Sequence, residues 1–213
     1  MWDRSRAAIV AKPYTPEIFP GRVRWQEIHV WDTHGKVVCE DAVPGLMAMN
    51  GIGMDREGDI YVMASPGRVL DKKRYWNEMA GTMIKLTPTK ARVTSSSGRA
   101  VVPLAKESWP TRPFDIVNSM LGAAWVKGAK WFYGGVGFDG FNPSHSGGGC
   151  DCWNSRFALD YFARSFAPEI GHFSVAVLDA AGNLILRVGT YGNVDDGLPF
   201  GKASKNAGKR SSG

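Results

Sequence analysis

The residues best suited to chemistry lie in one short stretch, "HSGGGCDCW", at 145–153. Cys150 and Cys152 are two positions apart, so on a strand both side chains would lie on the same face. The glycine run between them and His145 lets the imidazole fold back toward the two thiols. With His172, these residues offer four ligands suited to zinc or another thiophilic metal. Because Cys-x-Cys is not the usual zinc spacing, ordinary packing and a disulfide or redox pair stay open.

Short strands are expected to position these side chains. The chain has 213 residues, 44% of them hydrophobic, which is enough for one domain with a buried core. Aromatic residues make up 11% of the chain, and 26 glycines and 12 prolines are distributed along it. Aromatic residues between frequent turn formers are typical of an all-β protein.

The distribution of charge argues against a nucleic-acid partner. The net charge is +6, but four basic residues lie in the segment "GKASKNAGKRSSG" at 201–213, which has no acidic residue. The rest of the chain is therefore nearly balanced and lacks the basic face that nucleic acids require. We expect residues 200–213 to form a flexible, solvated tail.

The sequence contains no recognisable signal for a membrane or for export. No stretch approaches the run of about 18 apolar residues that spans a membrane, and the N-terminal residues lack the apolar core of a signal peptide. The three cysteines do not form the framework of a disulfide-stapled secreted domain. We expect a soluble protein without a membrane span, and its compartment stays open.

An internal repeat predicts the fold. The segment "GIGMDREGDIYVMAS" at 51–65 aligns with "RFALDYFARSFAPE" at 156–169, and Asp55 falls on Asp160. Each segment reads as a short alternating strand, a tight turn and a second strand. Two copies of one hairpin indicate a repeat architecture.

A second hairpin also occurs twice. The segment "EIHVWDTHGKVV" at 27–38 aligns with "SVAVLDAAGNLI" at 174–185, and Asp32 falls on Asp179. In both segments a glycine follows the aspartate by three positions. The aspartate can accept hydrogen bonds from amides just after it, and glycine adopts a positive φ, so the spacing predicts a hairpin turn.

Two copies of the motif depart from this pattern. Ala163 stands where the alignment places Gly58 in the other copy. A third and weaker copy is "AAWVKGAKWFYGG" at 123–135, where Gly128 takes the turn and Trp125 stands in place of the aspartate. We expect this third copy to form a hairpin as well.

Residues 155–189 are predicted to form one complete four-stranded antiparallel sheet. Its strands are expected around 156–160, 164–168, 173–179 and 183–189. A unit of about 40 residues with four strands has the length of one β-propeller blade.

The motifs "GMDREGDIYVMA" and "VAVLDAAGNLILRVGTYGN" resemble the NHL-repeat six-bladed propellers. The resemblance implies an all-β propeller of four-stranded antiparallel blades, of which about three to four are present. Because six blades need roughly 240 residues, the ring is expected to be incomplete. The missing blades would come from the rest of a longer chain or from another copy, since open sheet edges invite pairing.

The resemblance also sets the expected organisation of the chain. Residues 1–26 would be an N-terminal extension, and 27–199 would be the partial propeller. The segment 87–119, rich in serine, proline and basic residues, reads as an irregular insertion within it.

The function that the resemblance implies is a non-catalytic binding or scaffold module without a cofactor, whose loop face binds a protein or a glycan. The alternative is a metal-dependent hydrolase or lyase of the gluconolactonase-like type, with zinc or calcium in a central channel. Metal ligands would then be His145, Cys150 and Cys152, or asparagines.

Candidate ligand-binding residues lie near the expected inner strands. Asn50, Asn118 and Asn154 each fall within a few residues of such a strand, although asparagine is also a common turn residue. Arg156 could hold an anion at the channel mouth or could pair with a nearby carboxylate. Trp153 lies in a loop where its ring could stack on a sugar, as do Trp76 and Trp109.

Overall fold

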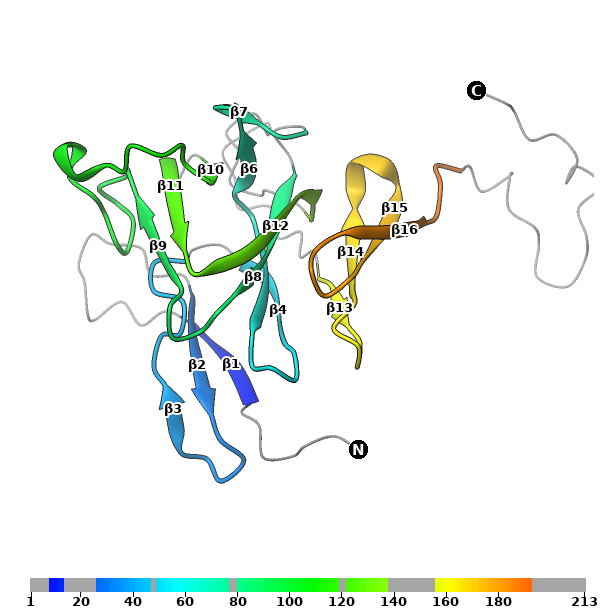
Figure 1. Ribbon diagram of the computed structural model, residues 1–213, viewed down its shortest axis with the longest axis horizontal. Helices are drawn as coiled ribbons and strands as arrows, with labels where there is room; N and C mark the ends of the chain where they lie inside the picture. Colours follow the sequence, from blue (N-terminus) through cyan, green and yellow to red (C-terminus); the bar gives the residue numbers. More distant parts are fainter. Residues whose placement is uncertain are drawn as a thin grey trace, which may run out of the picture.

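The computed structural model describes residues 8–13, 26–46, 49–76, 80–118, 122–137 and 156–192. Within these ranges the protein consists of β-strands, turns and two short 3-10 segments, and it has no α-helix (Figure 1). The expectation of an all-β fold is confirmed. In the same ranges no helix is long and apolar enough to cross a membrane.

The strands form four antiparallel sheets. Sheet 1 has the order β1-β2-β3, with bounds Ala8–Pro13, Gln26–Trp31 and Val37–Cys39. Sheet 2 has the order β4-β5-β8-β12, with bounds Met49–Met54, Ile60–Ala64, Gly81–Leu86 and Ala129–Val136. Sheet 3 has the order β13-β14-β15-β16, with bounds Ala158–Leu159, Ser165–Glu169, Ser174–Leu178 and Leu184–Val188. The side sheet has the order β9-β11-β10-β6-β7, with bounds Arg92–Ser95, Gly122–Lys127, Ile116–Asn118, Gly67–Leu70 and Lys73–Arg74.

Sheet 3 is the four-stranded sheet that the sequence predicts for 155–189. Its strands pair antiparallel in chain order, from β13 to β16. Neighbours in sequence are therefore neighbours in space, and each connection is a tight turn or the 3-10 segment Ile170–His172.

The inner hairpins of sheets 2 and 3 have the same register. Met54 lies opposite Ile60 across the β4–β5 turn, and Leu159 lies opposite Ser165 across the β13–β14 turn. These pairs occupy the positions that the alignment of Asp55 with Asp160 makes equivalent. The repeat is therefore present in the strand pairing as well as in the sequence.

The outer hairpins of sheets 1 and 3 match in the same way. Val30 pairs with Cys39, and Val177 pairs with Leu186 at the equivalent position. A register shift follows each of these pairs at the same place. One hairpin geometry, including its bulge, is used twice.

One carboxylate oxygen closes each of the four repeated turns. In each turn the aspartate Oδ1 accepts hydrogen bonds from the backbone N–H groups two and four residues later, at 2.8–3.1 Å. The aspartates are Asp32, Asp55, Asp160 and Asp179. In each turn the residue three positions later donates its own N–H to the aspartate carbonyl. The turn chemistry predicted from the motif is confirmed.

The fourth residue of each turn has a left-handed backbone. The φ values are 81° at Gly35, 86° at Gly58, 61° at Ala163 and 84° at Gly182. Ala163 thus adopts the conformation of the aligned Gly58 despite its Cβ, which ordinarily disfavours this region. The hydrogen bonds of Asp160 hold it there.

Sheet 2 lies between two apolar cores. On one face, Ile60, Val62 and Ile84 pack with Ile28 and Val30 of sheet 1 and with residues of the side sheet. Its opposite face forms the second core with sheet 3, through Tyr61, Met63, Met83, Ala167, Ala176 and Leu178. Both faces of β5 and β8 are therefore buried, as the continuous apolar sequence of β5 requires. β8 also buries the polar side chains of Thr82 and Lys85.

The expectation that residues 123–135 form a third hairpin is wrong. β11 pairs with β9 and β10, whereas β12 pairs with β8, so the two strands belong to different sheets. Trp125 provides no carboxylate to close the turn. Instead, the Gly128 carbonyl accepts a hydrogen bond from Thr87 N–H, and the chain crosses here from the side sheet to sheet 2.

Two segments outside the repeat contain regular strands. β1 lies within the expected extension 1–26 and pairs with β2 along its whole length. β9 and β10 lie within 87–119 and join the side sheet. The described sheets do not close into a ring.

We predict that Gly58→Ala destabilises the fold by about 1–2 kcal/mol, because the left-handed backbone conformation is unfavourable by this amount for a residue with a Cβ. An added Cβ at Gly58 would meet no atom within 4 Å, so the effect isolates the backbone. Urea unfolding measures the change. Gly98→Ala is the control, since Gly98 also has open space but no positive φ. Equal stability of the two variants would contradict the prediction.

Candidate functional site

Five of the residues that the sequence singles out lie outside the described residues. They are His145, Cys150, Cys152, Trp153 and Asn154. The metal site and the metal-dependent alternative therefore stay predictions. No group of three or more His, Cys, Asp or Glu residues that could hold a metal is found in the described ranges.

The other predicted residues do not gather at one site. Asn50 lies in β4 of sheet 2, whereas Asn118 is the last residue of β10 in the side sheet and is buried. Arg156 is exposed just before β13. The carboxylate of Asp160 pairs with Arg164, at 2.6 Å. Asn50 and Asn118 thus lie on strands of two different sheets, and Arg156 precedes a strand of a third.

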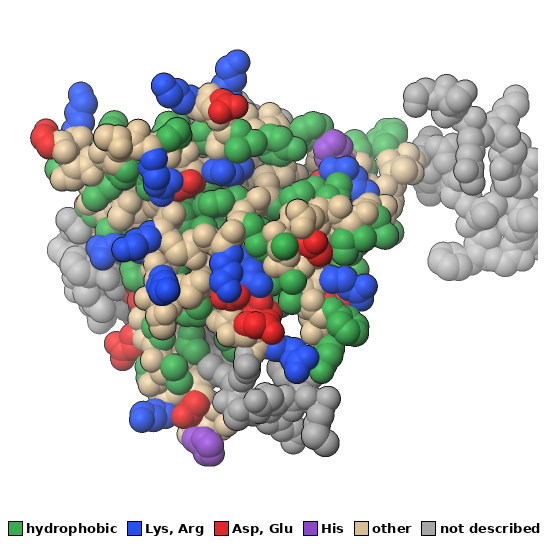
Figure 2. All heavy atoms as spheres, in the orientation of Figure 1, with side chains coloured by type: hydrophobic (Ala, Val, Ile, Leu, Met, Phe, Trp, Pro, Cys, Tyr) green, Lys and Arg blue, Asp and Glu red, His purple; other side chains and the backbone are tan. Residues whose placement is uncertain are grey.

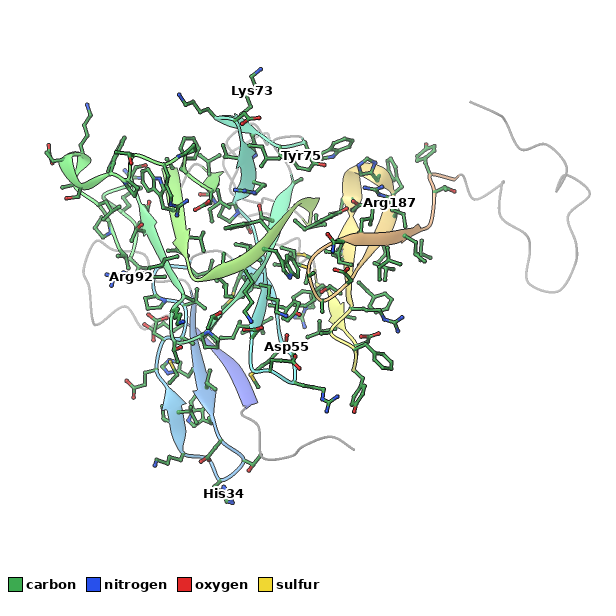
Figure 3. The ribbon with its side chains drawn as sticks, in the orientation of Figure 1. His34, Asp55, Lys73, Tyr75, Arg92 and Arg187 are labelled. Carbon is green, nitrogen blue, oxygen red and sulfur yellow. The ribbon has the colours of Figure 1, made fainter. Side chains whose placement is uncertain are left out.

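An exposed group of aromatic side chains lies at one end of sheets 2 and 3. We call Tyr75, Trp76, His172, Phe173 and Tyr191 the aromatic rim. Tyr75, Trp76, Phe173 and Tyr191 are 44%, 46%, 59% and 74% exposed. Figure 3 shows Tyr75 at the upper end of the molecule, opposite the turns that hold His34 and Asp55. The rim therefore occupies the end away from these two turns.

Ring contacts connect the rim across two sheets. The Trp76 ring stacks on His172, with centroids 4.1 Å apart and planes 30° apart. Phe173, next in sequence, meets Tyr191 edge to face at 4.7 Å. A Cβ at Gly135 would lie 3.6–3.7 Å from Tyr75 and Trp76, so both pack against the end of β12. Loop residues from three parts of the chain thus form one surface.

The backbone of the rim is strained. Trp76 has φ 67° and Phe173 has φ 53°, which is unusual for bulky side chains. Such conformations persist where the surroundings fix them, and they concentrate at binding sites. The stack on His172 supplies this constraint for Trp76.

A buried carboxylate supports the rim from below. Glu169, at the end of β14, is 2% exposed. Arg187 of β16 donates to both of its oxygens, at 2.6 and 3.1 Å. Tyr133 of β12 donates at 2.8 Å and Ser174 at 3.1 Å. This network joins sheets 2 and 3 beneath the 3-10 segment that carries His172.

The network fixes the charges of its members. Burial would raise the pKa of Glu169, but the hydrogen bonds from Arg187, Tyr133 and Ser174 outweigh burial and lower it. Burial and the bond to Glu169 raise the pKa of the Tyr133 hydroxyl. The bond to Glu169 also raises the pKa of Arg187. At neutral pH the network is therefore an ion pair with a protonated tyrosine, and it acts as a rigid support.

A second buried ion pair lies at the opposite end of sheet 2. Lys85 Nζ is 2.8 Å from Asp55 Oδ2 and 3.3 Å from Asp59 Oδ2, and all three side chains are buried. Tyr61 donates its hydroxyl to Asp55 at 3.1 Å. Burial is the largest cause that raises the pKa of Tyr61 to about 12. For Lys85, burial would lower the pKa, but Asp55 and Tyr61 outweigh it and raise it, so the amine stays charged and is not a nucleophile.

The same end of sheet 2 holds the outer turn of sheet 3. The carbonyl of Ala180 accepts hydrogen bonds from Lys85 Nζ at 3.4 Å and from Trp131 Nε1 at 3.1 Å. A Cβ at Gly182 would lie 2.6 Å from the Trp131 ring, so only glycine fits there. This contact is structural, and it fixes sheet 3 against sheet 2.

Sequence reasoning identified part of the rim. It placed Trp76 in a loop, where the structure has this residue, with 46% of it exposed and its ring stacked on His172. Stacking of the Trp76 ring on a ligand stays a prediction. It treated His172 as a metal ligand and did not identify Tyr75, Phe173 or Tyr191. Trp109 lies elsewhere, where its ring is 5.8 Å from that of Trp125.

No protein-family model, curated protein or solved structure matches the chain. The candidate site therefore depends on the geometry described above.

We predict that Glu169→Gln destabilises the protein by about 1–3 kcal/mol, because the charged hydrogen bonds of Arg187 are lost. The pKa of Glu169 is lowered from 4.5 in the folded state, so its contribution is present above pH 4.5 and is lost as pH falls through the folded pKa. Urea unfolding across acidic and neutral pH should show a smaller acid loss in the variant. Glu107→Gln, an exposed control, should behave as wild type, and an unchanged pH profile in Glu169→Gln would contradict the prediction.

We also predict that Lys85→Met destabilises the fold by about 3–5 kcal/mol, because it leaves the buried Asp55 carboxylate without its cation. Thermal or urea unfolding measures this loss. Lys127→Met is the matched control, since Lys127 is exposed at the end of β11. A loss no larger than that of the control would show that the ion pair does not stabilise the fold.

Proposed function

We propose that this protein is a non-catalytic binding module of the β-propeller type, in which sheets 1, 2 and 3 are successive blades. Shared hairpin registers and the stacking of sheet 2 between sheets 1 and 3 support this arrangement. The NHL-like motifs coincide with these hairpins. The side sheet is then an insertion between strands of the second blade.

The aromatic rim is the observation that carries the binding role. Monomeric proteins rarely leave several large aromatic side chains exposed together, and such patches mark interaction sites. Here four of them are at least 44% exposed on one surface. Their backbone and ring contacts fix them before any ligand arrives, which lowers the entropy cost of binding.

The chemistry of the rim favours a protein ligand over a glycan. A sugar site combines a stacking ring with polar groups that can bind hydroxyls. Near the rim, both oxygens of Glu169 already accept hydrogen bonds from Arg187, Tyr133 and Ser174. Exposed tryptophan and tyrosine side chains are typical anchors of protein interfaces. We therefore infer a peptide or protein surface with apolar side chains as the ligand.

Selection of peptides from a display library on the immobilised 213-residue chain tests this role. We predict that selected peptides carry apolar anchors and bind Trp76→Ala at least about tenfold more weakly, the cost of removing an interface anchor. Tyr161→Ala is the control, since Tyr161 is 40% exposed but lies at the β13–β14 turn.

Three outcomes would contradict the proposal. The chain could select no peptide, the peptides could bind Trp76→Ala as well as wild type, or Tyr161→Ala could weaken binding equally. A glycan array probed in parallel would identify a sugar ligand, which would overturn the choice of a protein partner.

A further inference from the structure

Sheets 1, 2 and 3 stack in one direction. The repeat makes Ile28 and Val30 of β2 equivalent to Val175 and Val177 of β15, because their hairpins have the same register. It likewise makes Tyr61 of β5 equivalent to Phe166 of β14, which lies opposite Val177. These residues define what we call the forward face of each sheet.

The forward face is covered in the first two sheets. Ile28 and Val30 of sheet 1 are 2% and 5% exposed, and they pack in the core shared with sheet 2. Tyr61 and Met63 of sheet 2 are fully buried in the core shared with sheet 3. In both places the opposite face of the next sheet contributes to the covering surface, and at sheet 1 residues of the side sheet contribute as well.

The forward face of sheet 3 is apolar. Val177 on this face is 6% exposed, whereas its outer strand β16 remains exposed. Leu186 and Val188 of β16, which pair with Val177 and Val175, are 48% and 56% exposed. Figure 2 shows hydrophobic side chains along the side of the molecule where sheet 3 lies. An apolar sheet face of this kind marks a docking surface.

The repeat also identifies the surface that fits this face. Sheet 3 covers sheet 2 through Ala176 and Leu178 of β15. The equivalent positions in β2 of sheet 1 are His29 and Trp31, which are partly exposed, with ring centroids 5.4 Å apart. The chain therefore presents, on its first sheet, the counterpart of the surface by which its third sheet docks.

We propose that the forward face of sheet 3 binds the opposite face of sheet 1 in a second copy of this chain. The contact is head to tail, so each copy uses a different surface toward each neighbour. It continues the stacking of sheets 1, 2 and 3 into the next molecule. The inference rests on the blade arrangement proposed above but not on the aromatic rim, so failure of peptide binding leaves it unaffected.

Sedimentation equilibrium of the full chain over a wide concentration range tests the contact. Wild type is expected to self-associate. Leu186→Asp should weaken association by about a hundredfold or more, because it buries an unpaired carboxylate against an apolar surface. Leu70→Asp is the control, since Leu70 is also 46% exposed but lies in β6 of the side sheet. It should associate as wild type does.

A mixing experiment tests the head-to-tail geometry. Trp31→Asp should also prevent self-association, because it changes the other surface. Mixed with Leu186→Asp, it should form a dimer of one variant with the other, since each variant retains one intact surface. Glu27→Lys, on the same face of β2, is the second variant if Trp31→Asp does not fold.

Several results would overturn the proposal. Wild type could stay monomeric at every concentration, or Leu70→Asp could weaken association as much as Leu186→Asp does. Failure of the two folded variants to form a mixed dimer would exclude the head-to-tail contact.

Discussion

The fold depends on a carboxylate oxygen that accepts two backbone N–H groups. Asp32, Asp55, Asp160 and Asp179 each close a turn in this way. Because the turn fixes which residues face each other across a hairpin, it also fixes which side chains reach each core. Because the same interaction closes four turns, equivalent residues of the repeated hairpins lie on equivalent faces of their sheets.

The turns also connect the sheets. Asp55 closes its own turn with Oδ1 and holds Lys85 with Oδ2, and Lys85 then reaches the Ala180 carbonyl in the turn closed by Asp179. A local hairpin interaction is thereby linked to the packing of sheet 3 on sheet 2. At the other end, Glu169 and its partners fix the same two sheets beneath the aromatic rim. Sheets 2 and 3 are thus held together by a buried carboxylate at each end, Asp55 at one and Glu169 at the other.

The parts of this fold that local sequence encodes could be predicted. Asp179 and Gly182 define a hairpin because every interaction of the turn lies within a few residues. The order of the side sheet could not be predicted, because β6 pairs with β10 and β9 pairs with β11 far along the chain, and pairing of distant strands leaves no local pattern.

In the candidate site, too, the sequence indicates some features but not the contacts between distant residues. The exposure of Trp76 follows from its place in a loop. Its contact with His172 joins loops of two sheets, and no spacing in the sequence indicates it. The pairing of Glu169 with Arg187 likewise requires knowledge of which faces of β14 and β16 meet.

The strand order of sheet 2 has a consequence for biosynthesis. Sheet 3 can assemble as soon as its own residues leave the ribosome, because its strands are consecutive. In sheet 2, β8 must wait for β12 while β9, β10 and β11 are made, so one side of β8 has an open row of amides and carbonyls. Open strand edges of this kind are where nascent chains mispair, and chaperones would act at this stage.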